Sequence, residues 1–369
     1  MLSGGGAAAP LHRIESAGSH RASALTCAVD SVSDTTWDSI VGDFADAHHE
    51  QTSYFSAKAW NGRGSKLLLL DGDRPVAGAR VAIFALPGFK SGLAHLKFGP
   101  FWRRRDRAPD AEVYRAAIAA LVEEFCVRRG HCLTVMPRPH PEFYPIECEV
   151  LAERQFAVRR AVSDPNRYLV DLSLGEDAQL RSLDQKWRYN LRRAMAENID
   201  IRLCDSETDG ETFRALHRSM VARKNFPGPK ADHLLAAGGA DVPAMVRPQL
   251  IMGFRNGQPI VGAVVGLFGD SASYMLGASA PEALALNAGY ALQWWIVRWL
   301  SGQGGVRWYD LGGEAGERGL RQFKKGLAGK SGAVVAMRGE HDCWANPSGR
   351  IAADLIYAVR AAQRAVRWR

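Results

Sequence analysis

The sequence repeats a hairpin-like pattern, and this repeat limits the folds that are open to the chain. The segments KLLLLDGDRPVAGARVAIFALP (66–87) and PQLIMGFRNGQPIVGAVVGLFGD (248–270) each predict two apolar strands joined by a tight turn. When Pro75 is aligned with Pro259, which lies 184 positions later, the identical pairs also include Gly78/Gly262, Ala79/Ala263, Val81/Val265 and Phe84/Phe268. One short alignment of this kind can arise by chance, so the elements that follow each hairpin decide its meaning.

The same succession of predicted elements follows both hairpins. Apolar residues at helical spacing predict a helix over 110–129, and the apolar run 132–137 predicts a strand after it. After the second hairpin come a strand over 271–279, a helix over 287–301 and a strand over 306–311. Hairpin, helix and strand therefore occur twice, which indicates a duplicated α/β unit with a mixed sheet in each copy.

The remaining segments complete two predicted domains. Further strands are predicted over 167–173, 199–203 and 333–339, further helices over 176–198, 207–224 and 350–369, and a Pro/Gly-rich connection over 225–243. The predicted organisation is a flexible tail over 1–22, a first domain over 23–162 and a second domain over 163–330. The segment 331–369 is expected to complete the first domain, with its last helix packed on that domain. An anionic membrane surface is the alternative contact for 350–369, because this helix is rich in arginine.

Composition and charge narrow the class of protein. The chain of 369 residues is 47% hydrophobic and 23% charged, which is ordinary for a globular protein. Its net charge of +8 is compatible with a polyanionic partner such as nucleic acid, a pyrophosphate-bearing substrate or an anionic membrane. The six cysteines form no CxxC pair and no metal-ligand spacing, so no metal site is predicted. Without a signal peptide or a bilayer-spanning apolar run, the protein is expected to be cytoplasmic, at the inner face of the membrane if the last helix docks there.

The helix predicted over 176–198 carries the basic motif KWRYNLRRA (186–194). One apolar stripe runs along it, formed by Leu183, Trp187, Leu191, Ala194 and Met195. Its rims carry the cations Lys186, Arg188, Arg192 and Arg193, and no acid falls between positions 186 and 196 to balance them. A solvated rim of a packed helix and an anion-binding edge are both compatible with this pattern. No helix-turn-helix or zinc-finger pattern surrounds the motif, so DNA is not an expected partner.

Segments on and after this helix resemble the Fem-type aminoacyltransferases. KWRYNLRRAMAENIDI (186–201) is similar to the family signature K-x-R-x-N-hydrophobic-R-[RK]-A…G-I-x-[IV]. WYDLGGEAGERGLRQFKKGLAGK (308–330) is similar to the family segment YD[FL]GG…GL…FK.GFG, and NAGYALQWWIVRWL (287–300) to the helix before it. The resemblance covers most of residues 165–330 in the family's order. It implies an α/β chain of two tandem GNAT-like domains, the fold of the acyl-CoA N-acyltransferases, each a mixed twisted sheet flanked by helices.

The resemblance also implies a chemistry and a set of site residues. Family members join an amino acid from aminoacyl-tRNA to an amine of a peptidoglycan precursor, so a neutral amine attacks an activated carbonyl carbon. The lysine that the family ties to catalysis maps to Lys324, whose ammonium would stabilise the developing oxyanion. Asp310, at the end of a predicted strand, would either orient the amine or Lys324 or cap the loop that follows the strand. The substrate-binding positions are Lys186, Arg188, Arg193, Tyr274 and Phe323, the cations being suited to pyrophosphate or to tRNA phosphates.

Departures from the family patterns leave the substrates open. Where an acetyl-CoA-binding domain has [QR]-x-x-G-x-[GA], LNAGYA (286–291) keeps Gly289 as a cofactor-binding candidate but has Leu286 at the Gln or Arg position. The expected function is an N-acyltransferase with no required cofactor, using aminoacyl-tRNA as donor and a phosphorylated or lipid-linked cell-envelope precursor as acceptor. One alternative is an acyl-CoA-dependent N-acyltransferase acting on an envelope sugar or a small amine. The other is a catalytically silent tandem protein that binds a polyanion.

Overall fold

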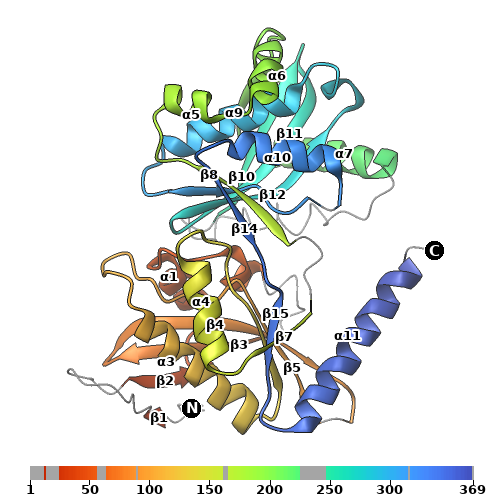
Figure 1. Cartoon of the computed structure of the whole chain (residues 1–369). Coiled ribbons are helices and arrows are strands. Elements are labelled where there is room, and N and C mark those ends of the chain that lie inside the picture. Colours follow the sequence, from red (N-terminus) through yellow and green to blue (C-terminus); the bar gives the residue numbers. More distant parts are fainter. Residues whose placement is uncertain are drawn as a thin grey trace, which may run out of the picture. The chain divides into compact units, whose positions relative to one another are not determined.

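Figure 1 shows the computed structural model of the chain, which describes residues 12–13, 25–55, 64–88, 90–160, 165–224, 247–314 and 316–367. The described residues form two compact units, one drawn from Met1–Val162 and Arg338–Arg369 and the other from Ser163–Met337. The predicted connection 225–243 lies outside the described residues, as does the predicted tail 1–22 apart from the two-residue strand β1 (His12–Arg13). Within the described ranges, no helix has both the length and the apolar character needed to cross a membrane.

The first unit is built on one mixed sheet. Its strand order is β1-β2-β3-β4-β5-β6-β15-β7, where β2 is Thr26–Val29, β3 Gly64–Asp71, β4 Arg74–Ala85, β5 Gly92–Lys97, β6 Cys132–Met136, β15 Glu340–Cys343 and β7 Ala157–Arg160. The predicted hairpin is β3–β4, which turns at Gly72 with a positive φ of 61°. Because glycine adopts this backbone conformation without strain, Gly72 allows the strands to reverse within two residues.

Helices lie on both faces of this sheet (Figure 1). Ala94 and Leu96 of β5 join the main core together with residues of α3 (Ala111–Leu121) and α4 (Phe143–Glu153). The opposite face of β5 carries Leu93, which packs with Ala353 and Ile356 of α11 (Pro347–Arg367). Since successive strand side chains alternate between faces, α11 covers the face opposite to α3 and α4. The other helical segments of this unit are α1 (Asp34–Gly42), η1 (His49–Gln51) and the π-helical η2 (Val122–Arg128), which continues α3.

The second unit repeats the sheet design. Its strand order is β14-β8-β13-β12-β11-β10-β9, where β14 is Ala333–Ala336, β8 Asn166–Asp171, β13 Trp308–Asp310, β12 Ser271–Ser279, β11 Gln258–Phe268, β10 Gln249–Arg255 and β9 Asp200–Cys204. In both units one pair of neighbouring strands is parallel, β5–β6 and β12–β13, and the other pairs of described strands are antiparallel. The predicted α/β fold class, with a mixed sheet in each copy, is confirmed.

Helices also surround the second sheet. They are α5 (Glu176–Ser182), α6 (Gln185–Met195), α7 (Glu207–Lys224), η5 (Pro281–Ala283), α9 (Ala288–Ser301) and α10 (Arg318–Ala328). α9 packs against α6, β10 and β11, whereas α10 packs against α6 and β8. α7 packs against β11 and β12. The two segments that carry the family motifs, α6 and α10, are therefore in direct contact.

The two sheets exchange one strand relative to the chain order. β8 follows β7 directly in the chain, yet it lies in the second sheet between β13 and β14. β15 follows β14, yet it lies in the first sheet between β6 and β7. The first sheet is therefore completed by β15, which comes after the whole second unit in the chain, whereas all strands of the second sheet come from Ser163–Met337.

Two predicted elements and one residue of the predicted apolar stripe differ from the structure. The helix predicted over 176–198 is interrupted, because Leu183 is extended with ψ at 150° and the carboxylate of Asp184 caps α6 by accepting from the amide of Lys186 at 2.9 Å. Met195, placed on the apolar stripe, is 58% exposed, because α6 ends there and the stripe is buried only as far as Ala194. The strand predicted over 333–339 ends at Ala336, and the sequence analysis did not predict β15.

Candidate functional site

Lys324 is buried on the inner side of α10. Lys324 is only 7% exposed, and its ammonium donates to the carbonyl oxygen of Gly313. A β-carbon on Gly312 would lie 3.5 Å from the Lys324 Nζ, so the ammonium lies against the turn that follows β13. Gly312 has a φ of 77°, which glycine alone adopts without strain. The next residue, Lys325, is exposed and lines a separate hollow along α10.

Asp310 ends β13 and is held on two sides. One carboxylate oxygen accepts from the Arg167 Nη2 at 2.6 Å and from its Nε at 3.3 Å. The other oxygen accepts from the amide of Gly312 at 2.8 Å, so Asp310 shapes the same glycine turn that Lys324 contacts. Because Asp310 is 5% exposed and already paired with a guanidinium, its geometry suits a positioning role better than proton abstraction. Sequence analysis missed Arg167, since a single arginine at the start of a strand carries no motif of its own.

Strands β12 and β13 part next to this turn. Their parallel pairing consists of Ser271–Trp308, Ala272–Tyr309 and Ser273–Asp310, whereas β12 continues to Ser279 without a partner in β13. The pairing of β11 with β12 shifts register at the same place, because Val264 faces Leu276 but Val265 faces Tyr274. The divergence begins at Asp310, at the carboxyl ends of the parallel pair, where α/β folds commonly bind ligands.

Tyr274 follows the last paired residue of β12. Its hydroxyl lies against Gly277, where a β-carbon would approach to 1.6 Å, so only glycine leaves room for the phenol. Burial raises the pKa of Tyr274 to about 12, and the phenol is therefore neutral at physiological pH. A neutral phenol can donate a hydrogen bond, and it is a poor proton acceptor at this pH. The phenol of Tyr309 interacts electrostatically with that of Tyr274, and its hydroxyl donates to the side-chain oxygen of Gln293 at 2.9 Å.

Three aromatic rings join the helices that carry the motifs. The ring of Trp187 on α6 lies 5.0 Å from that of Tyr290 on α9 and 5.9 Å from that of Phe323 on α10, and the last two are 4.9 Å apart. Gly326 permits the close approach, because a β-carbon there would meet the Trp187 Cδ1 at 2.9 Å. The cluster fixes α10 at Phe323, directly before Lys324. Phe323, predicted to bind substrate, is therefore placed in the packing between helices.

The cations of α6 have different surroundings. The Arg188 guanidinium donates to the carbonyl oxygens of Leu183 at 2.6 Å and Arg181 at 3.0 Å, so it caps the carboxyl end of α5. Lys186 is exposed and lines an open hollow of about 470 Å³, together with Asp184, Gln185, Tyr189 and Arg192. Arg193 is exposed outside that hollow. Within the described part of the chain, Lys186 and Arg193 form no ion pair. The structure thus places two of the three predicted cations at the surface and uses the third as a cap.

The start of α9 fits a coenzyme A pyrophosphate only in part. A β-carbon on Gly289 would meet no atom within 4 Å, so there is space beside the first turn of the helix. Leu286 is 9% exposed and places an apolar side chain in the protein interior where acetyl-CoA-binding domains have Gln or Arg. The backbone amides of a helix N-terminus are available in any helix, and no additional polar side chain at position 286 supports them.

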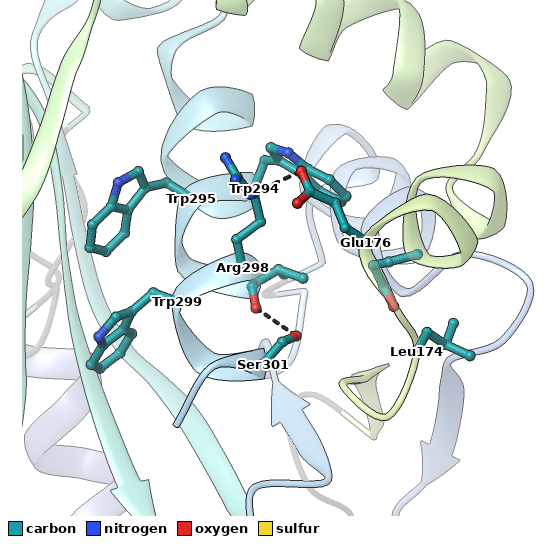
Figure 2. A pocket seen from close by; sticks show the side chains of 9 residues that line it. Leu174, Glu176, Trp294, Trp295, Arg298, Trp299 and Ser301 are labelled. Carbon is teal, nitrogen blue, oxygen red and sulfur yellow. Dashed lines mark hydrogen bonds and ion pairs between the residues drawn. The ribbon is translucent and has the colours of Figure 1, made fainter. Parts of the chain in front are cut away.

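A separate cavity lies beside the carboxyl half of α9. It has a volume of about 440 Å³ and is lined by Leu174, Glu176, Gln179, Trp294, Trp295, Val297, Arg298, Trp299 and Ser301. Figure 2 shows Trp295 and Trp299 on one side of α9 and Leu174 and Glu176 on the other, with Arg298 paired to Glu176 at 2.9 Å. None of the predicted site residues lines it. Leu174 follows Asp171, which pairs with the first residue of β13, so this cavity lies at the opposite end of that strand from Asp310.

Comparisons with known proteins agree with this architecture. No protein-family model matches the sequence, and no curated protein matches it either. Among solved structures, FemX is similar with a TM-score of 0.69 and 12% identity, covering 85% of this chain and 96% of FemX. The C-terminal domain of a putative lysylphosphatidylglycerol synthetase from Agrobacterium fabrum is similar with a TM-score of 0.56 and 13% identity, covering 87% of this chain and 95% of that domain. L-PGS from Bacillus licheniformis has a TM-score of 0.54 and 13% identity, covering 90% and 96%. The chain therefore has the tandem GNAT-like fold seen in FemX, which confirms the Fem-type resemblance of its motifs at the level of the fold.

Proposed function

We propose that the protein is an N-acyltransferase that forms an amide bond between an activated aminoacyl or acyl donor and an amine. The observation that carries this proposal is the buried Lys324 ammonium, which lies against the Gly312–Gly313 turn where β12 and β13 part. A cation held in a site of low exposure stabilises developing negative charge far better than one in water. The fold shared with FemX supports a reaction of this class.

The reaction assigns distinct tasks to these residues. The neutral amine of the acceptor attacks the carbonyl carbon of the donor, and the resulting oxyanion is stabilised by the Lys324 ammonium. Collapse of this intermediate breaks the bond to the leaving group, which takes up the proton that the amine loses. Asp310, held by Arg167, keeps the glycine turn in the shape that Lys324 requires. We assign Tyr274 the role of a further hydrogen-bond donor, because its neutral phenol on β12 can donate but accepts a proton poorly.

The favoured donor is aminoacyl-tRNA, and the favoured acceptor is an amine of a cell-envelope precursor of the peptidoglycan type. Lys186 and Arg193 are exposed and form no ion pair in the described residues, so phosphates of an RNA acceptor end can reach them. The apolar Leu286 disfavours the alternative donor, acyl-CoA, although the space beside Gly289 keeps this second candidate open to test. A silent polyanion-binding protein remains the third hypothesis, because the exposed cations alone would serve it.

Substitution of the lysines tests the proposal. Lys324→Ala is expected to lower turnover by at least about a hundredfold, the usual cost of removing an oxyanion-stabilising group. The matched control is Lys325→Ala, which removes an exposed lysine from the same helix and should leave turnover unchanged. Lys186→Ala should raise KM for the donor with little change in kcat. Unchanged kcat in Lys324→Ala together with an unchanged KM for the donor in Lys186→Ala, measured as labelled acyl transfer to an amine, would show that the site is assigned wrongly.

The donor is distinguished by two further measurements. Acyl-CoA that binds the folded chain tightly must raise its melting temperature, since a ligand that binds only the folded state stabilises it. Transfer activity that is abolished by ribonuclease, without a thermal shift by any acyl-CoA, supports aminoacyl-tRNA. A shift of several degrees by acyl-CoA together with ribonuclease-resistant transfer supports the alternative.

A further inference from the structure

The cavity beside the carboxyl half of α9 has the size and the lining of a small-molecule site. Its volume of about 440 Å³ lies within the range of roughly 300–1,000 Å³ that such sites occupy. Aromatic and aliphatic residues make up most of its lining, namely Leu174, Trp294, Trp295, Val297 and Trp299. Trp294 and Val297 are only 5% and 2% exposed, so close packing holds this part of the lining in place. The cavity therefore offers a preformed apolar surface to a ligand.

One polar residue of the lining, Gln179 on α5, is buried with an unpaired acceptor. The residue is 3% exposed, and its carboxamide oxygen has no hydrogen-bond partner among the described residues. A buried acceptor without a partner lowers the stability of the folded chain, so each such group calls for an explanation. The last side-chain torsion of glutamine has a broad range, so the oxygen can turn towards a ligand in the cavity that Gln179 lines. A ligand that donates a hydrogen bond to this oxygen would explain why the glutamine is there.

The other polar groups of the lining select the charge and the polarity of the ligand. Glu176 and Arg298, the two charged residues of the lining, form an ion pair with each other at 2.9 Å (Figure 2). A charged ligand would therefore find no unpaired counter-charge among the lining residues, so an uncharged ligand is favoured. The Ser301 hydroxyl donates to the carbonyl oxygen of Val297 at 3.0 Å, which leaves its oxygen as an acceptor. The lining thus presents hydrogen-bond acceptors, at Gln179 and Ser301, to a ligand that donates.

We propose that this cavity binds an uncharged aromatic compound with an N–H or O–H donor, its ring against the apolar lining and its donor bonded to the carboxamide oxygen of Gln179. Aromatic rings gain from contact with tryptophan rings beyond the burial of apolar area. The donor loses its hydrogen bonds to water when it enters the cavity, and the Gln179 oxygen replaces them. The proposal is independent of acyl transfer, because none of the residues assigned to that reaction lines the cavity.

Isothermal titration calorimetry of the full chain with two probes of the same shape tests the proposal. Indole carries one N–H donor, whereas benzofuran has a ring oxygen in the same place and can only accept. The wild-type chain should bind indole at least about fivefold more tightly than benzofuran, as expected for one hydrogen bond to a buried acceptor. Gln179→Leu should remove this preference for indole. The matched control is Gln258→Leu, which makes the same change at an exposed position of β11 and should keep the preference.

The melting temperature of the ligand-free chains gives a second readout. Because Gln179→Leu removes an unpaired buried acceptor and places an apolar side chain of similar size there, the variant should melt at the wild-type temperature or above it. A variant that melts several degrees lower contradicts the proposal, since the glutamine would then be satisfied within the fold. The comparison of the two probes on the wild-type chain needs no variant. Absence of indole binding, or equal binding of indole and benzofuran, overturns the proposal, as does a preference for indole that Gln179→Leu retains.

Discussion

Gly326→Ala tests whether α10 is held against α6 closely enough to fix Lys324. Gly326 lies two positions after Lys324, and a β-carbon there would lie 2.9 Å from the Cδ1 of Trp187 and 3.4 Å from its Cβ. Trp187 has little room to move, since it is 2% exposed and its ring contacts those of Tyr290 and Phe323. The added methyl group must therefore push α10 away from α6.

Two opposing contributions set the expected change in stability. Replacing glycine by alanine inside a helix gains about 1 kcal/mol from helix propensity. Inserting a methylene-sized group into a packed site costs about 1–3 kcal/mol, so Gly326→Ala should lose up to about 2 kcal/mol in net free energy of unfolding. Gly319→Ala on the same helix is the matched control, because a β-carbon there meets no atom within 4 Å. This control should gain up to about 1 kcal/mol from propensity alone.

Urea unfolding followed by tryptophan fluorescence measures both variants, and labelled acyl transfer measures turnover. Gly326→Ala is expected to unfold at lower urea than wild type and to lose turnover as Lys324 moves with its helix, whereas Gly319→Ala should retain both. The reasoning is refuted if Gly326→Ala is as stable as Gly319→Ala. It is also refuted if the helix is destabilised and turnover remains at the wild-type level, because Lys324 would then not depend on this contact.

Three other predictions concern single contacts. Arg167→Met should lower the free energy of unfolding by about 2 kcal/mol, which is less than for a fully buried pair because the Arg167 side chain is 21% exposed. Adding Asp310→Asn should restore part of this loss in a double-mutant cycle, and full additivity of the two changes would refute the pairing. Arg188→Ala should cost about 1 kcal/mol through the lost caps, whereas Arg193→Ala should cost nothing measurable, and equal unfolding midpoints would contradict the capping role. Burial raises the pKa of the Glu147 carboxyl to about 8, so the folded chain binds the carboxyl proton more tightly than the unfolded chain does. The stability that this proton provides is present below pH 4 and falls as pH rises towards 8. Glu147→Gln removes this pH dependence. In urea titrations, the free energy of unfolding of the variant minus that of wild type should rise by about 2–3 kcal/mol between pH 5.5 and 7.5. A difference that does not change with pH would contradict the burial of a protonated acid.

The parts of the fold that were predictable are those with local signals. The turns at Gly72 and Gly257 need positive φ, which glycine supplies, and the flanking apolar runs are strands because their residues are buried on both faces. The family resemblance assigned residues of both motifs to one site. The helices that carry them, α6 and α10, are in contact, with the rings of Trp187 and Phe323 5.9 Å apart between centroids, although this packing was not predicted.

The parts that escaped prediction depend on contacts distant in sequence. The role of Arg167 depends on its ion pair with Asp310, which lies on a strand far along the chain. Neither an arginine at position 167 nor an aspartate at position 310 indicates this pairing in the sequence. The interruption before α6 depends on Asp184 acting as a cap, yet an aspartate is also tolerated inside a helix and the apolar stripe passes through this point. β15 has the sequence EHDC, which carries no apolar alternation, and it becomes a strand because it is paired on both sides.

The two units differ in the strand that borders the parallel pair and in the turn that follows this pair. β8 begins soon after β7, and a short connection favours placing it beside β7 in the first sheet. It instead lies beside β13, where Arg167 meets Asp310, and β15 takes the equivalent place beside β6, where Asp342 accepts from Thr134 at 2.7 Å. β13 continues into a glycine turn whose amide bonds to Asp310, whereas β6 continues into Pro-Arg-Pro (137–139), whose prolines have no amide hydrogen to donate. Among the described residues of the first unit, β6 is therefore not followed by a glycine turn like the one that the Lys324 ammonium contacts, so the proposed acyl-transfer site is assigned to the second unit.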